Sequence, residues 1–117
     1  MLEALTQVVA DNTRSLLLAY DTPYPEPLHS TRPIPDAFGV ALVLAPRHSA
    51  QALAQISVSL TDAAAQQLDN AALEALRMAI PAARSLPLLR CIAQRQAARV
   101  VLDYLDSTRL EVAVSPC

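Results

Sequence analysis

The sequence predicts an α+β fold, with a small antiparallel sheet of about three strands and two to four helices packed on one face. Stretches around Ile56 and Leu110 alternate apolar and polar side chains, as half-buried strands do, while longer segments repeat apolar residues at helical spacing. The 117 residues are expected to form a single domain, 1–117. The alternative is an all-α bundle, because the alanines and glutamines at the start of residues 49–60 also suit a helix.

The N-terminal part of the chain is predicted to be an amphipathic helix followed by a proline-rich arm. Over residues 2–20, one helix face collects Leu2, Leu5, Val9, Leu16 and Tyr20. This helix is expected to end near Asp21, because the prolines that follow lack an amide donor and disfavour a helical residue before them. Residues 21–36 contain five prolines and are predicted to form an extended arm or loop, with polyproline II favoured over residues 23–28.

Two strands are predicted in the middle of the chain. Residues 40–45 form a short apolar run that Pro46 stops, as expected of a buried strand. Residues 56–60 alternate apolar and polar side chains, as expected of a half-buried strand. The two stretches are expected to pair in antiparallel fashion.

Helices and a last strand are predicted for the second half. Apolar residues at steps of three and four predict a helix over residues 62–80, in which Asn70 is a candidate cap for a second helix. Ser85 and Pro87 mark another helix start, and residues 88–105 are predicted to be helical, with Cys91 on the buried stripe. Residues 110–114 alternate again and predict a terminal strand.

The composition points to a small soluble protein of a reducing compartment. Hydrophobic residues make up 53% of the chain, and all nine basic residues are arginines, which we interpret as the imprint of a GC-rich bacterial genome. Two cysteines are too few for a disulfide framework, and no apolar run approaches the ~20 residues that span a bilayer, so a cytoplasmic location and no membrane partner are expected. The apolar excess indicates that another protein or a second copy covers part of the surface.

No catalytic, metal-binding or cofactor-binding constellation is predicted, so the chain is not expected to be an enzyme. Two histidines and two cysteines match no metal-ligand spacing, and the single glycine, Gly39, argues against phosphate-binding loops. A thiol enzyme that uses Cys91 and His48 is an alternative, but Cys91 falls on a predicted buried stripe, where cysteine packs as a small hydrophobe. Asp103 is expected to pair with Arg99 on the surface of the last helix.

Charge and the proline arm supply the candidate binding residues. Residues 77–117 carry six arginines against three acids. If the last helix is exposed on that side, Arg95 and Arg99 present adjacent guanidinium groups, a fork suited to carboxylates or phosphates. In the arm, one aromatic and one aliphatic side chain are candidate anchors. The candidate partner-binding residues are Tyr24, Leu28, Arg84, Arg90, Arg95 and Arg99.

These residues predict a non-enzymatic protein–protein interaction module, such as a small bacterial adaptor, inhibitor or immunity-type protein. A homodimer fits this prediction as well as a complex with another protein does. The alternative is a small nucleic-acid-binding regulator that uses an Arg-rich helix face. The net charge of −2 and the scarcity of aromatic residues make that alternative less favoured.

Overall fold

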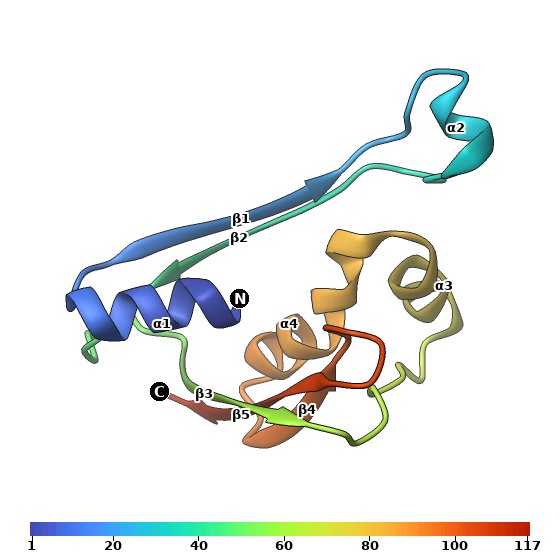
Figure 1. Ribbon diagram of the computed structural model, residues 1–117. Helices are drawn as coiled ribbons and strands as arrows, with labels where there is room; N and C mark the ends of the chain where they lie inside the picture. Colours follow the sequence, from blue (N-terminus) through green and yellow to red (C-terminus); the bar gives the residue numbers. More distant parts are fainter.

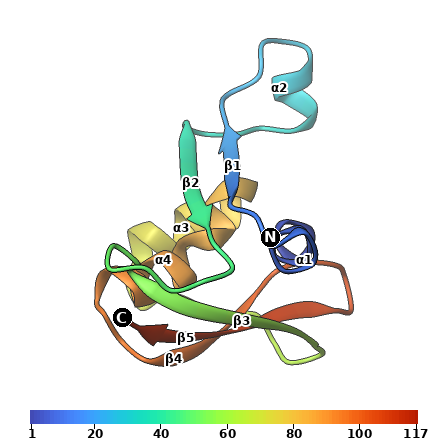
Figure 2. The same cartoon turned by 90° about the vertical axis from the view of Figure 1, so that its left-hand side faces the viewer.

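A computed structural model of the chain describes all 117 residues and confirms the α+β class. The strands form two separate antiparallel sheets, one of two strands and one of three (Figure 1). The molecule is elongated, with principal extents of 45 × 29 × 28 Å. Its long dimension follows the two-stranded sheet, which extends past the helices and carries a short helix at its far end (Figures 1 and 2).

The three-stranded sheet confirms two of the predicted strands. It consists of β3 (Ala54–Thr61), β4 (Ala98–Leu102) and β5 (Arg109–Pro116), in the order β3-β5-β4. The two alternating stretches of the sequence pair directly, with Ile56 opposite Val114 and Leu60 opposite Leu110. Strand β5 is the central strand, and its inward-facing residues Leu110, Val112 and Val114 are all buried.

The main hydrophobic core lies between this sheet and α4 (Leu86–Ala93). Leu88 and Cys91 on α4 pack with Val100 and Leu102 of β4 and with the buried side chains of β5. Pro87 stands in the first turn of α4, where its missing amide donor costs nothing. The 3-10 turn η1 (Pro81–Ser85) precedes α4 and adds Ala83 to a second, smaller core.

The predicted helix over residues 2–20 is wrong in its second half, where the chain forms a strand of the two-stranded sheet. We call this sheet the ribbon. Helix α1 spans only Leu2–Asp11, and Asn12 ends it in the left-handed conformation, with φ 51° and ψ 39°. Asparagine tolerates that conformation better than most residues, so it is a natural helix end. The chain then continues as β1 (Ser15–Asp21), which pairs along its whole length with β2 (Phe38–Leu44).

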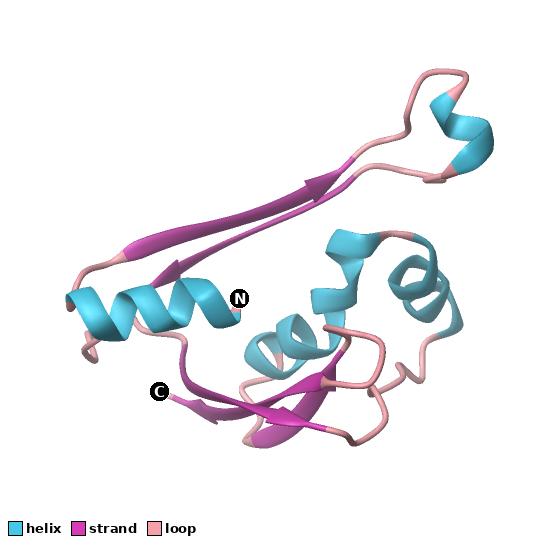
Figure 3. Cartoon of the chain, viewed as in Figure 1, coloured by secondary structure: helices cyan, strands magenta, loops and turns pink.

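The partner predicted for residues 40–45 is also wrong. That stretch is a strand, β2, but it pairs with β1 and not with β3. The loop after β2 carries the chain away from the ribbon to the three-stranded sheet, where β3 pairs with β5 instead (Figure 3). Because residues 15–21 form a strand and not a helix, the apolar stretch 38–44 has a second possible partner, and it pairs with that strand although residues 54–61 are nearer in the sequence.

Two predicted helices are shorter than expected. Over residues 62–80, only α3 (Ala71–Ala79) is helical, and its N-cap is Asn70, whose side chain accepts a hydrogen bond of 3.0 Å from the amide of Leu73, as predicted. Residues 62–70 instead run past β4, where the Gln66 amide donates to the Val101 carbonyl at 2.8 Å. The predicted helix over residues 88–105 ends at Ala93, because the chain turns at Arg95, which has φ 50°, and returns as β4.

Candidate interaction surface

One face of the ribbon consists entirely of uncharged residues that are exposed to solvent. Side chains alternate between the two faces of a strand, so paired strands present the same alternate positions together. The outward cross-strand pairs are Leu16 with Val43, Leu18 with Ala41, and Tyr20 with Gly39. We call these six residues the outer ribbon face. The side chains of Leu16, Leu18, Tyr20 and Val43 are 60%, 61%, 77% and 73% exposed.

The opposite face of the ribbon is held against the body of the molecule. Leu44 is buried, and Phe38 packs against the small core that contains Ile34, Ile80 and Ala83. The Asp21 carboxylate accepts a hydrogen bond of 2.6 Å from the Ala82 amide, which fixes one end of the ribbon to η1. Helices lie under this inner face, whereas no element covers the outer face (Figures 1 and 3).

The outer ribbon face has a ridge and a hollow. The ridge is made by the large side chains of β1, and the hollow lies along β2, where the outward residues become smaller from Val43 through Ala41 to Gly39. A shallow cavity of about 260 Å³ opens at the small end, and it is lined by Leu18, Ala19, Tyr20, Gly39, Val40 and Ala41. The face therefore has a definite shape, with a protruding Tyr20 beside an unfilled space.

The edges of the ribbon are open as well. Each of its strands pairs with only one neighbour, so one row of backbone donors and acceptors per strand has no strand partner. Proteins usually protect such edges with charged residues, proline or bulges. Neither strand contains proline, and the only charged residue in either is Asp21 at the end of β1.

The predicted anchors of the proline arm lie in the loop beyond the ribbon. Tyr24 is 38% exposed and Leu28 is 57% exposed, so both are accessible. The predicted polyproline II conformation does not extend through this stretch, because Pro27 has helical angles, with φ −87° and ψ −1°, and Leu28 begins the short helix α2 (Leu28–Thr31). The arm returns to the body through Ile34, which is 5% exposed and packs against Ile80 and Ala83.

The four candidate arginines do not form one helix face. Arg95 lies in the turn after α4 and Arg99 on β4, so the two residues do not share the helix that was expected to present their guanidinium groups side by side. Arg99 pairs with Glu111 on the neighbouring strand at 2.8 Å, which corrects the predicted pairing with Asp103. Arg90 pairs with Asp69 at 3.3 Å. Arg84 and Arg95 are exposed.

Asp103 belongs to a different ion pair, which sequence reasoning missed. Arg77, only 5% exposed, donates two hydrogen bonds to Glu74 (2.9 and 2.6 Å) and one to Asp103 (2.8 Å). The Glu74 carboxylate also accepts from the Leu68 amide at 2.8 Å. The bonds from Arg77, followed by that from Leu68, lower the pKa of Glu74 from 4.5 to about 2. This network ties α3 to the end of β4 and is satisfied within the chain.

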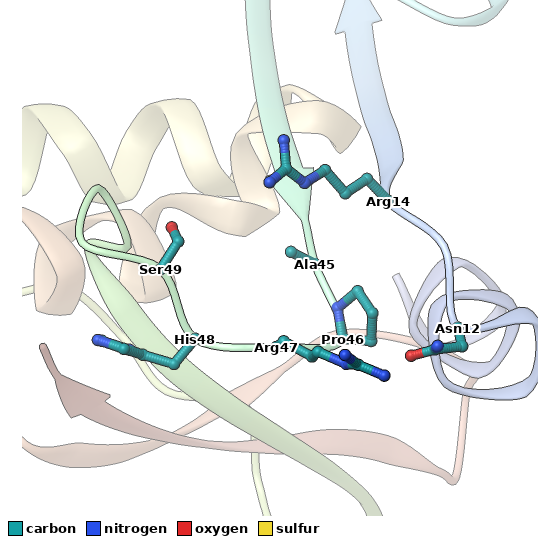
Figure 4. A pocket seen from close by; sticks show the side chains of 7 residues that line it. All are labelled: Asn12, Arg14, Ala45, Pro46, Arg47, His48 and Ser49. Atoms are coloured by element: carbon teal, nitrogen blue, oxygen red, sulfur yellow. The ribbon is translucent and has the colours of Figure 1, made fainter.

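A second hollow, of about 310 Å³, lies where the ribbon meets the loop after β2. It is lined by Asn12, Arg14, Ala45, Pro46, Arg47, His48 and Ser49. Three basic side chains border it, but Arg14, Arg47 and His48 point in different directions (Figure 4). The arrangement therefore lacks the convergent donors that would hold one anion.

The structure does not bring Cys91 and His48 together as a thiol enzyme would need. Cys91 is 7% exposed and belongs to the main core. His48 instead lies beside Cys117, with 3.6 Å between Nδ1 and Sγ, and both residues are exposed. No group of three or more His, Cys, Asp or Glu side chains stands together in a way that would hold a metal ion. None of the helices combines the length and the apolar character that a membrane span requires.

Comparison with known proteins finds no relative of this chain. The chain matches no protein-family model, and no curated protein and no solved structure is significantly similar to it. The outer ribbon face is thus the most distinctive surface of the molecule on physical grounds alone.

Sequence reasoning missed the outer ribbon face because residues 15–20 were assigned to a helix, although a run of apolar residues ending in an aromatic one also suits a strand.

Proposed function

We propose that this protein is a non-enzymatic interaction module that binds a protein partner through the outer ribbon face. The observation that carries the proposal is the uninterrupted apolar surface formed by both strands, in which four large side chains are at least 60% exposed. Contiguous exposed apolar surface of this kind usually marks a protein interface. The proposal keeps the predicted class, a small bacterial cytoplasmic adaptor, inhibitor or immunity-type protein, but moves the binding surface from the apolar and arginine-bearing helix surface and the proline-rich arm to the ribbon.

The ribbon's architecture supports the same proposal. An isolated two-stranded sheet is marginally stable in water, and it gains stability when a third strand or another layer covers it. Here the body covers one face only, and both edges are open. The composition agrees, because 53% of residues are hydrophobic while only 15 of 117 residues are buried. Much of the apolar material therefore remains at the surface, where a partner would remove it from water.

The arrangement of charge favours a protein partner over a nucleic acid. Nucleic-acid binding uses clustered, available cations along a surface. Arg90 and Arg99, two of the four arginines considered for that role, are paired with carboxylates of the same chain. The apolar ribbon carries no basic side chain within either strand.

Site-specific photo-crosslinking in cells that express the protein tests this proposal. A benzophenone amino acid replaces Val43 on the outer ribbon face, and a matched control replaces Val9 on α1. The two side chains are 73% and 75% exposed, so they differ in location and hardly in accessibility. We expect a discrete covalent adduct from position 43 and none from position 9. Absence of an adduct at position 43, or the same adducts from both positions, would contradict the proposal.

A further inference from the structure

We propose that the occupant of the outer ribbon face is a second copy of this chain, packed face to face about a two-fold axis that runs along the strands. This inference rests on the proposed function and names its partner. In this arrangement β1 of one copy lies over β2 of the other, and the ridge of each copy enters the hollow of its partner. The observations that lead to it are the sizes of the paired residues and the position of the only glycine.

Gly39 has no conformational reason to be glycine. Its φ is not positive, so its backbone is open to any residue. A β-carbon added at this position would meet the Tyr20 Cβ at 3.6 Å and the Ala19 carbonyl oxygen at 4.0 Å, which are ordinary contacts. A glycine inside a strand weakens that strand and often marks the close approach of another group. Within one copy nothing approaches Gly39 from outside, so the space is available to a partner.

The outward residues of the two strands are complementary in size at two of the three levels. The cross-strand pairs combine leucine with valine, leucine with alanine, and tyrosine with glycine. A two-fold axis along the strands sets each β1 residue over the β2 residue of the same level in the other copy. The largest residue, Tyr20, then lies over Gly39 of the second copy, and Leu18 lies over Ala41. Large residues facing small ones allow two layers to interdigitate at native packing density.

An axis across the strands gives a poorer match. It would place β1 over β1, with Leu18 facing Leu18 and Tyr20 facing Leu16, so that ridge would meet ridge. On β2, Ala41 would face Ala41 and Gly39 would face Val43, so the space over Ala41 would remain empty, and empty apolar space lowers the stability of packed layers. The axis along the strands is therefore the arrangement that the residue sizes favour.

Charge and area both suit a second copy. Two identical faces bring identical charges together, and the outer ribbon face contains no charged residue. Covering its exposed side chains removes about 500 Å² per copy, estimated from the usual areas of aromatic and aliphatic side chains. The total of about 1,000 Å² is at the lower limit for a specific interface. We therefore expect a reversible dimer with a dissociation constant in the micromolar range.

Sedimentation velocity of the full chain between 1 and 500 μM tests the dimer. We expect the wild-type chain to pass from monomer to dimer over this range. Gly39→Val should raise the dissociation constant at least tenfold, because it fills the hollow, while the melting temperature of the monomer at 1 μM stays equal or rises. Ser57→Val is the control, since it adds the same side chain at an exposed strand position of the other sheet. It should leave the dissociation constant unchanged.

A compensating variant makes the test specific to this arrangement. Tyr20→Ala combined with Gly39→Val exchanges the large and the small position, so that a small residue again faces a larger one. We expect this double variant to recover at least half of the affinity, in logarithmic units, that Gly39→Val loses. The inference would be overturned if Gly39→Val left the dissociation constant of the dimer unchanged. It would also be overturned if the double variant dimerised more weakly than Gly39→Val alone. A wild-type chain that stays monomeric at 500 μM would overturn it too. In that last case, a crosslink from position 43 to a different protein would still uphold the proposed function, whereas no crosslink would end both.

Discussion

The ribbon is built from more apolar sequence than the three-stranded sheet, but its outer apolar face is exposed, whereas the apolar face of the three-stranded sheet is covered. On β5 the inward residues Leu110, Val112 and Val114 are nearly inaccessible, and an amphipathic helix packs over them. On β1 the outward residues Leu16 and Leu18 are about 60% exposed. Both regions present apolar side chains, and they differ in what lies against those side chains.

This difference separates two uses of apolar residues in one small chain. Burial against α4 stabilises the fold within a single copy, because apolar surface leaves water when the chain folds. The outer ribbon face contributes little to this stabilisation until a partner covers it. A chain with one Phe and no Trp has few large side chains to bury, so leaving three leucine-sized residues and a tyrosine outside is a substantial departure from maximal stability.

The largest expected contrast is between truncations in the two regions. Leu88 is 0% exposed and contacts the sheet from α4, so Leu88→Ala should lower the free energy of unfolding by about 2–5 kcal/mol. Leu18→Ala should change it by less than about 0.5 kcal/mol in the monomer, because the side chain already faces water. Urea unfolding at 1 μM measures both values. Equal losses would show that the ribbon face is already covered within one copy.

A pH dependence should reveal the ion network that belongs to the three-stranded half. The pKa of Glu74 falls from 4.5 to about 2 on folding, so its ionised form contributes stability that is fully present above pH 4.5. That contribution should decrease as the pH falls from 4.5 towards 2, as the carboxylate takes up a proton and loses its bonds to Arg77.

Comparison of the wild-type chain with Glu74→Gln isolates this effect. The difference in unfolding free energy between the two should be constant from pH 7 to about pH 5 and should shrink towards pH 2. Asp69→Asn is a suitable control, because its pair with Arg90 is long and exposed, and little change is expected. A wild-type to Glu74→Gln difference that does not depend on pH would mean that the network contributes nothing to folding.

The two regions also differ in how well the sequence predicts them. The strands around Ile56 and Leu110 were predicted because one of their faces is buried and the other is polar, which produces a clear period of two. The ribbon lacks that signal: residues 15–21 read Ser-Leu-Leu-Leu-Ala-Tyr-Asp, with apolar side chains on both faces. Without alternation, the spacing from Val9 to Leu16 and Tyr20 fitted a helix equally well.

Local conformational signals explain the other differences. Asn70 was predicted as a cap and acts as one, because the preference of asparagine for that position is a property of its side chain. Ala98, Val101 and Leu102 match a helix stripe by spacing, but the left-handed Arg95 turns the chain before them, and nothing in the residue type announces that turn. The pairing of Arg77 with Asp103 joins residues 26 positions apart, so it depends on the fold.

The smallest expected effect concerns the attachment of the ribbon to the body. The Asp21 carboxylate accepts the Ala82 amide, and Asp21→Ala should cost about 1 kcal/mol, the usual net value of one hydrogen bond. The loss should be local, because Asp21 ends β1 and Ala82 begins the turn ahead of α4. Backbone amides of β1 and β2 should therefore exchange faster with deuterium, while those of β5 keep their protection. Asp21→Asn retains an acceptor oxygen, so its free energy of unfolding should lie between those of the wild-type chain and Asp21→Ala. If β5 lost protection to the same extent, the ribbon and the three-stranded sheet would unfold as one unit, and the division of apolar residues between folding and binding would not hold.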